Sequence, residues 1–229
     1  TLTLESRLKA GGASSIAVPE LGARLARFYW RAPRVRRSAT RALVEWRAAV
    51  ELNAKVLLDP RLPVPRGAVR AAVAAQRRFL RRQGQLLAAR ARARRILDAH
   101  GDLRPEHIWL GEPLCVIDRL EFSAALRSVD PADELALLEV ETAFLGAPSV
   151  GLRVRERVLA AMHDKPPDVL LMFYRSARAL LRARLTIAHL LEPDPRTPEV
   201  WAPRARRYLA LGLRDAKALS VRLRTPAGR

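Results

Sequence analysis

The stretch HGDLRPEH, residues 100–107, decides how this chain is interpreted. Its aspartate, Asp102, follows a His-Gly pair in a short polar segment, and a second aspartate, Asp118, ends the apolar run 114–117. Residues 111–113, Gly-Glu-Pro, separate that run from the apolar residues that follow the polar segment, and this composition predicts a turn. We therefore expect a small β-hairpin that brings the two carboxylates to the same end.

Helical periodicity predicts a mainly α-helical chain around this hairpin. The expected helices are Pro19–Arg31, Ser38–Leu58 with Ser38 as its cap, Gly67–Ala99, Pro131–Leu145, Gly151–Met162, Asp168–Leu191 and Pro198–Leu223. Gly84 is a candidate interruption of the longest helix, and Pro203 predicts a kink in the last one. Helices, then one hairpin, then more helices do not fit a parallel-sheet fold.

Three segments resemble the motifs of aminoglycoside phosphotransferases and choline-kinase-like enzymes. HGDLRPEHI is similar to that family's H-G-D-x-x-x-x-N, and CVIDRLEF is similar to its strand that ends in Asp. The segment DPADELA, residues 130–136, resembles the family's D-P-x-x-D-L-A, whose second aspartate braces the catalytic loop through backbone hydrogen bonds, and we interpret Asp133 as structural. The helical run from Tyr174 to Arg184 is similar to the C-terminal helices of an uncharacterised bacterial branch of this family. The resemblance therefore covers the chain from about Leu21 to Leu191.

This resemblance implies a fold and an activity. Residues 1–229 would form one helical C-terminal lobe of a protein-kinase-like fold, with catalytic motifs at residues 100–136 and C-terminal helices at 149–226. The activity would be the ATP-dependent transfer of the γ-phosphate to a hydroxyl group of a small molecule. Asp102 would accept or orient the hydroxyl proton, Asp118 would bind Mg²⁺, and Ile117 would lie beneath the nucleotide.

One position departs from the family pattern. The family's metal-binding Asn corresponds to His107, and Mg²⁺ prefers oxygen ligands whereas imidazole suits zinc, copper, iron or nickel. Three interpretations stay open: Asp118 binds the metal with water and phosphate oxygens, His107 contacts a phosphate, or the site is impaired as in a pseudokinase-like module. A transition-metal hydrolase site built from His100, Asp102, His107 and Asp118 is a further alternative.

The sequence shows no kinase-like N-terminal sheet lobe. Such a lobe would supply a Gly-rich phosphate loop and a strand lysine. The chain has only four lysines, none in an apolar strand context. We therefore expect that the chain begins, at Thr1, near the hinge between two lobes, that the missing N-terminal lobe is its partner, and that residues 1–229 alone bind ATP poorly and are inactive.

The chain is strongly basic, with a formal net charge of +19. Only four of its 42 basic residues are Lys, and the arginines are spread over the whole chain. A GC-rich coding bias would give the same composition without selection for binding. Ten arginines and no acidic residue lie between Arg66 and Arg95, and on a helix they predict a basic face. A basic nucleic-acid-binding helical protein is therefore an alternative function. The charge also repels polycations, so we expect a neutral or anionic acceptor rather than an aminoglycoside.

Cysteine usage and hydropathy predict a cytoplasmic protein. The single cysteine, Cys115, lies in an apolar strand segment and cannot form an internal disulfide, which favours a reducing compartment and a structural role. No uncharged apolar stretch is long enough to predict a membrane span, and no signal peptide is visible.

Overall fold

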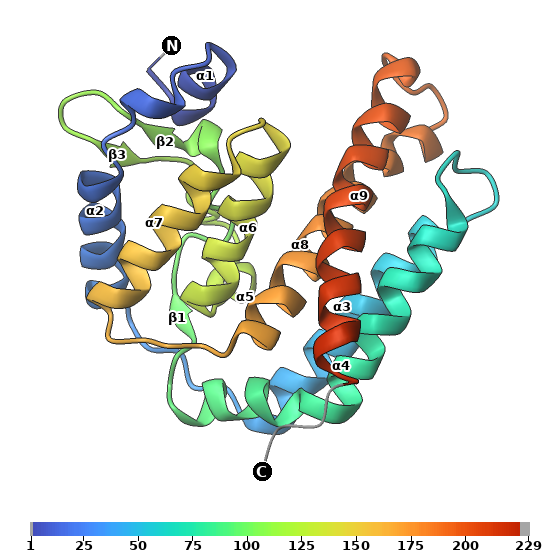
Figure 1. Cartoon of the computed structure of the whole chain (residues 1–229), viewed down its shortest axis with the longest axis horizontal. Coiled ribbons are helices and arrows are strands. Elements are labelled where there is room, and N and C mark those ends of the chain that lie inside the picture. The colour runs from blue at the N-terminus through green and yellow to red at the C-terminus, as the bar shows by residue number, and fades with distance from the viewer. Residues whose placement is uncertain (1, 225–229) are drawn as a thin grey trace. The chain divides into compact units, whose positions relative to one another are not determined.

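A computed structural model describes residues 2–224, and in that part of the chain it has nine α-helices, three 3-10 turns and two two-stranded sheets (Figure 1). The predicted mainly helical class is confirmed. The described residues divide into two compact units. Unit 1 contains residues 2–37 and 90–167, and unit 2 contains residues 38–89 and 168–224. The assignment of the whole chain to one kinase-like lobe stays a prediction, and Thr1 and residues 225 and 226 of the predicted ranges lie outside the described residues.

Unit 1 contains five short or medium helices and all the strands. The helices are α1 (Leu4–Lys9), α2 (Val18–Arg31), α5 (Ala124–Arg127), α6 (Pro131–Phe144) and α7 (Pro148–Ala161), and 3-10 turns occupy Ala13–Ser15 and Pro105–His107. Strand β1 (Leu97–Asp98) pairs with β4 (Ser128–Val129), and β2 (Ile108–Trp109) pairs with β3 (Cys115–Val116), both antiparallel.

Helix α6 forms the centre of unit 1. Every residue from 131 to 142 is buried, and α7 packs against it and against α2. The carboxylate of Asp130 caps the helix by accepting the amide of Ala132, and Pro131 occupies the first turn. Gly151 of α7 lies so close to α6 that a Cβ there would meet the Cα of Glu139 at 2.8 Å. A side chain at 151 would therefore push the two helices apart.

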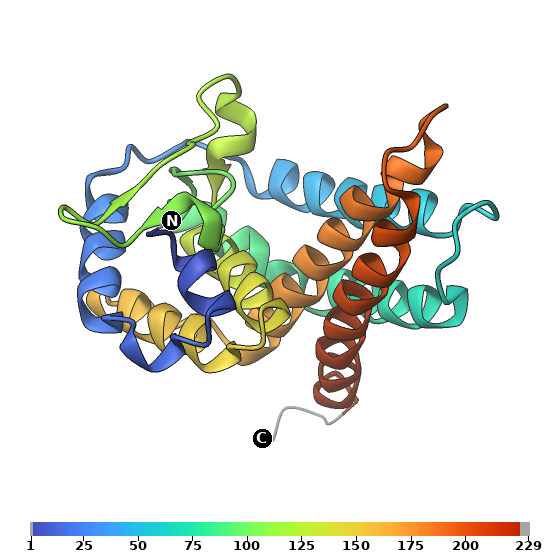
Figure 2. The same ribbon diagram turned by 90° about the horizontal axis from the view of Figure 1, so that it is seen from above.

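The hairpin is confirmed. In β2–β3, Ile108 pairs with Val116 and Trp109 with Cys115. The N-terminal residues join it, because the amide of Leu110 donates to the carbonyl of Leu2 at 2.7 Å (Figure 2). Helix α1, which periodicity did not predict, follows directly and is capped by Thr3.

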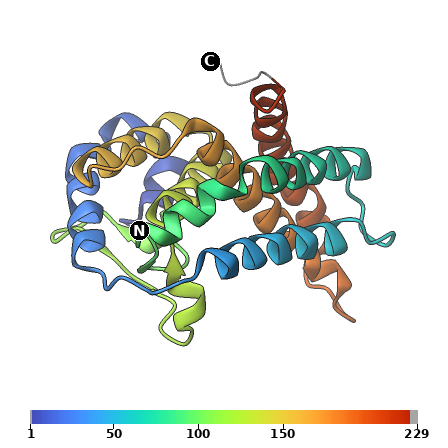
Figure 3. The same cartoon turned by 90° about the horizontal axis from the view of Figure 1, so that it is seen from below.

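Unit 2 is a group of long helices. They are α3 (Ala39–Leu57), α4 (Arg66–Arg92), of which residues 90–92 belong to unit 1, α8 (Asp168–Ala188) with the 3-10 turn His189–Leu191, and α9 (Pro198–Arg222), which contains Pro203. Figure 3 shows α3 and α4 running side by side, joined by the ion pair between Glu51 and Arg77. The rings of Phe79 and Phe173 stack with centroids 4.2 Å apart and tie α4 to α8.

Two expectations about α4 are corrected. The helix passes through Gly84 without interruption and ends at Arg92, not at Ala99, since Arg94 adopts a left-handed backbone with φ of 54° and the chain then enters β1. The Arg66–Arg95 segment is also not a uniform basic face. Arg77 is paired with Glu51, and Arg90 is buried.

Arg90 forms a buried network within unit 1. Its guanidinium donates two hydrogen bonds to Asp130, at 2.6 and 2.7 Å, and two to Asp164, both at 2.6 Å. Burial by itself lowers the pKa of Arg90, but the hydrogen bonds and charges of the two carboxylates raise it above its ordinary value. The arginine is therefore a structural cation at the start of α6.

Among residues 2–224, no helix combines the length and the apolar composition that a bilayer crossing requires.

Candidate functional site

The loop that carries Asp102 is held by a buried carboxylate. Glu134 of α6, 1% exposed, accepts the amide of Gly101 at 2.5 Å and the amide of His100 at 3.4 Å. The hydroxyl of Tyr29 donates to the same carboxylate at 2.8 Å. The second Asp of the D-P-x-x-D-L-A pattern corresponds to position 134 of this chain, so Glu134 stands where the resemblance implies a bracing carboxylate. Gly101 has φ of 92°, a conformation that a glycine adopts without strain.

Asp102 is partly exposed and pairs with an arginine. The Nε of Arg104 lies 2.8 Å from the Oδ2 of Asp102, and its Nη1 lies 2.5 Å from Glu106. The carboxylate thus has a cation two residues away in the chain. A guanidinium in this place can also stabilise the negative charge of a phosphoryl group.

His107 lies between the two predicted site carboxylates. Its Nδ1 lies 2.8 Å from the backbone carbonyl of Asp102 and 3.9 Å from the Oδ2 of that residue. On the opposite edge of the ring, Nε2 lies 3.1 Å from the Oδ2 of Asp118. The hairpin therefore brings Asp102 and Asp118 to either side of one buried imidazole.

The same imidazole has a defined hydrogen-bonding pattern. A carbonyl oxygen only accepts, so Nδ1 carries the proton that is donated to Asp102. Nε2 then faces both the Oδ2 of Asp118 and the Nη2 of Arg104, the latter at 3.4 Å. A metal ion that took this nitrogen would have to displace the guanidinium.

Asp118 and Ile117 are the exposed members of the site. The side chain of Asp118 is 72% exposed, and its backbone has φ of 60°, which turns the chain at the end of β3. Ile117 is 48% exposed, and its amide donates to the carbonyl of His107 at 2.9 Å. Both side chains are therefore available to a ligand.

His100 holds the loop. Its Nε2 donates to the carbonyl of Ile117 at 2.7 Å, its Nδ1 accepts the amide of Asp102 at 3.3 Å, and its ring stacks on that of His107. Burial lowers the pKa of His100, and the bond to Ile117 only partly offsets this. Because both ring nitrogens are already bonded, His100 has no lone pair free for a metal, which weighs against the four-residue transition-metal site.

The donors present suit a metal that a nucleotide brings with it. Within residues 2–224, no three His, Cys, Asp or Glu side chains lie together in a way that could bind a metal ion. Mg²⁺ is commonly held by one or two carboxylates together with phosphate oxygens and water. The exposed carboxylate of Asp118 fits that role, and the Nε2 of His107 fits it poorly.

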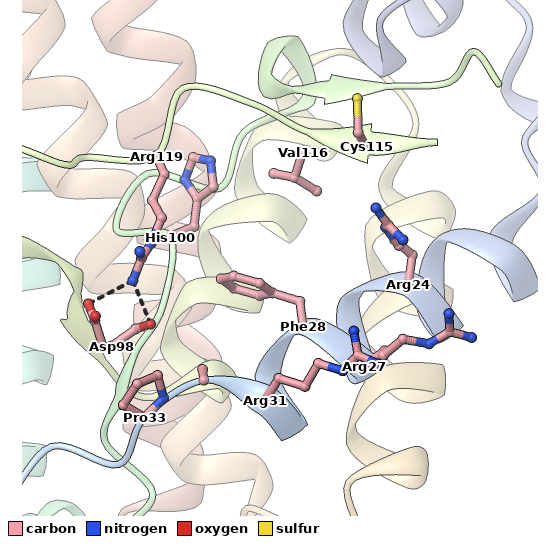
Figure 4. A pocket seen from close by; sticks show the side chains of 11 residues that line it. Arg24, Arg27, Phe28, Arg31, Pro33, Asp98, His100, Cys115, Val116 and Arg119 are labelled. Carbon is pink, nitrogen blue, oxygen red and sulfur yellow. Dashed lines mark hydrogen bonds and ion pairs between the residues drawn. The ribbon is translucent and has the colours of Figure 1, made fainter. Parts of the chain in front are cut away.

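A pocket of about 390 Å³ lies beside this site, within unit 1 (Figure 4). It is lined by one face of α2, by β3, and by residues in or near the Asp102 loop: Arg24, Arg27, Phe28, Arg31, Ala32, Pro33, Asp98, His100, Cys115, Val116 and Arg119. Sequence reasoning missed it. The only signal was the spacing of three arginines at 24, 27 and 31, which places them on one face of a helix.

Comparison with known proteins gives a partial match. A stretch of 145 residues is 31% identical to the uncharacterized proteins Rv2004c and MT2060 of Mycobacterium tuberculosis and Mb2027c of Mycobacterium bovis. The match covers 62% of this chain and 28% of each relative, so the chain corresponds to little more than a quarter of their length. No protein-family profile and no solved structure gives a significant match. The chain thus has a distant, partial similarity to uncharacterized mycobacterial proteins.

Proposed function

We propose that this chain carries the catalytic loop of an ATP-dependent phosphotransferase of the aminoglycoside phosphotransferase-like type, which acts on a hydroxyl group of a small cytoplasmic molecule. The single observation that carries the proposal is the position of Asp102 and Asp118 on either side of the His107 ring. Unit 1 would be part of a kinase-like C-terminal lobe, completed by an N-terminal lobe that binds ATP.

Each residue has a separate role in this proposal. Asp102 orients the acceptor hydroxyl and takes its proton, a contribution on the order of 10²–10⁴ in rate. Asp118 holds Mg²⁺, which neutralises charge on the nucleotide phosphates when bound. Ile117 contacts the nucleotide from below. Glu134 and His100 fix the loop through the bonds to Gly101, Asp102 and Ile117.

Two contacts favour a second candidate, a pseudokinase-like module that binds nucleotide without turnover. The Nε of Arg104 lies 2.8 Å from the Oδ2 of Asp102, the carboxylate that would receive the proton. His107 occupies the position of the family's metal-binding Asn, so an imidazole stands in place of an amide oxygen. If these contacts persist when nucleotide binds, Asp102 is not free to act as a base.

Phosphate transfer to a panel of neutral and anionic alcohols tests the proposal, in the longest natural polypeptide that contains these residues. Asp102→Asn is expected to reduce turnover at least 100-fold, a typical lower bound for general base catalysis. Asp118→Asn should also reduce turnover, because it removes the proposed Mg²⁺ ligand. Asp194→Asn, in an exposed loop, is the matched control and retains full activity. Efficient turnover by Asp102→Asn would refute the assignment.

Nucleotide binding separates the two candidates. The impaired module predicts binding without turnover, and His107→Asn would then strengthen Mg²⁺-dependent binding. For residues 1–229 alone, weak ATP binding is expected, and micromolar affinity measured by calorimetry would contradict the need for another lobe. If the α4 arginines bind nucleic acid, the affinity for DNA or RNA should fall steeply as salt increases and should not change when Asp102 is replaced.

A further inference from the structure

We propose that the pocket between α2 and β3 binds a small organic anion in which a phosphate or carboxylate group is attached to a flat, apolar group. This inference does not depend on the phosphotransferase proposal, because neither Asp102 nor Asp118 lines the pocket. Its volume of about 390 Å³ falls in the range of small-molecule sites, roughly 300–1,000 Å³.

The charges of the pocket select an anion. Arg24, Arg27 and Arg31 lie three and four residues apart along α2, so they share one face of the helix. All three are exposed, and within residues 2–224 none is paired with a carboxylate. Three like charges on one face repel one another, and a bound anion would relieve that repulsion.

The acidic residue of the pocket is already neutralised. Asp98 accepts hydrogen bonds from Arg127 and pairs with Arg119, each at 2.8 Å. The guanidinium of Arg119 also donates to the carbonyls of Asp98 and Ala99. The bond to Arg127 holds the pKa of Asp98 below its ordinary value, so this carboxylate stays charged and paired and does not oppose an anion at the arginine side.

The walls of the pocket select a flat, apolar group. Figure 4 shows the Phe28 ring extending from α2 into the pocket, toward the side where His100, Asp98 and Arg119 lie, and Val116 of β3 is a further apolar wall. Pockets for small molecules combine such apolar walls with a few charged groups that fix the orientation of the ligand. Guanidinium groups bind phosphate and carboxylate in the same forked geometry, so either anion fits.

Cys115 supplies a reporter inside the pocket. It is the only cysteine of the chain, it lines the pocket, and it is partly exposed. The rate at which a neutral reagent such as iodoacetamide alkylates this thiol therefore reports on this pocket alone. A ligand bound between Phe28 and Val116 should slow the reaction.

The test uses residues 1–229 and phenyl phosphate as the probe. Phenyl phosphate is expected to protect Cys115, inorganic phosphate less strongly, and benzyl alcohol not at all. Arg24→Gln/Arg27→Gln should raise the concentration needed for half protection at least tenfold. Arg47→Gln/Arg70→Gln removes the same charge from exposed positions of α3 and α4 and should leave protection unchanged.

Several outcomes would overturn the proposal. One is no protection by phenyl phosphate at about 10 mM, where binding is too weak to be specific. Equal protection by benzyl alcohol would show that the arginines do not select the ligand. Protection only by an RNA oligonucleotide or by acidic lipid vesicles would assign the surface to a macromolecule instead. Calorimetry with the same proteins gives a second measurement that does not use the thiol.

Discussion

Replacing Glu134 by Gln should destabilise unit 1 and loosen the Asp102 loop. The carboxylate is buried and accepts two short hydrogen bonds, from the amide of Gly101 and the hydroxyl of Tyr29. Hydrogen bonds to a charged group contribute about 1.5–3 kcal/mol each and are roughly twice as strong as neutral ones. Gln keeps the shape but removes the charge, so the two bonds together should lose about 1.5–3 kcal/mol.

Urea denaturation of residues 1–229 measures this loss, followed by a fluorescence or circular-dichroism signal. Hydrogen exchange at the Gly101 amide locates it, because that amide should exchange faster in Glu134→Gln. Tyr29→Phe in both backgrounds completes a double-mutant cycle, and we expect a coupling of about 0.5–3 kcal/mol between residues in contact.

The matched control is Glu112→Gln, an exposed glutamate in the hairpin turn. Its effect should stay within about 0.5 kcal/mol. If Glu134→Gln behaves like this control and the exchange of the Gly101 amide is unchanged, then Glu134 does not brace the loop, and the reasoning is refuted.

Three further predictions follow from the same structure. Arg90→Leu should cost about 3–5 kcal/mol, because it removes the buried cation that Asp130 and Asp164 share. Arg77→Gln, in the exposed pair between α3 and α4, should cost at most about 1 kcal/mol, and equal losses in thermal unfolding would contradict this. Gly101→Ala should lower the free energy of unfolding more than Gly146→Ala. Both glycines have positive φ, but only at position 101 would a Cβ lie close to other atoms, 3.0 Å from the carbonyl oxygen of Leu126. Chemical denaturation compares the two variants, and an equal loss would mean that the chain around position 101 accommodates the Cβ without cost. Arg127 and Arg119 lower the pKa of Asp98, so the contribution of this carboxylate to stability is complete above the unfolded pKa of about 3.9 and is lost as pH falls through the lower folded value. The stability difference between wild type and Asp98→Asn should therefore shrink below about pH 4. A difference that stays constant during acid titration would argue against the ion pairs.

Local signals in the sequence predicted the elements that local chemistry determines. The apolar run 114–117 with its Gly-Glu-Pro turn predicted the hairpin, and Ser38 predicted the start of α3, where its side chain accepts the amide of Arg41. Most helices begin and end within a few residues of the predicted bounds.

Features that depend on distant contacts were not predictable in the same way. The end of α4 depends on the left-handed backbone of Arg94, which no residue type requires. The bonds from the loop amides to Glu134 depend on which side of α6 faces the loop, and nearly all of that helix is buried, so hydrophobic periodicity could not indicate that side. The pocket needs α2 and β3 to lie together, although more than 80 residues separate them.

Asp130 has two structural functions at once, because the carboxylate that caps α6 also receives the guanidinium of Arg90. Glu134 lies one turn further along the same helix. Replacement of Arg90 would therefore shift the first turn of α6 and, with it, the carboxylate that positions Gly101. During evolution, residues 90, 130 and 164 should consequently change together or not at all, and a homologue that has lost the arginine should also have neutral side chains at the other two positions.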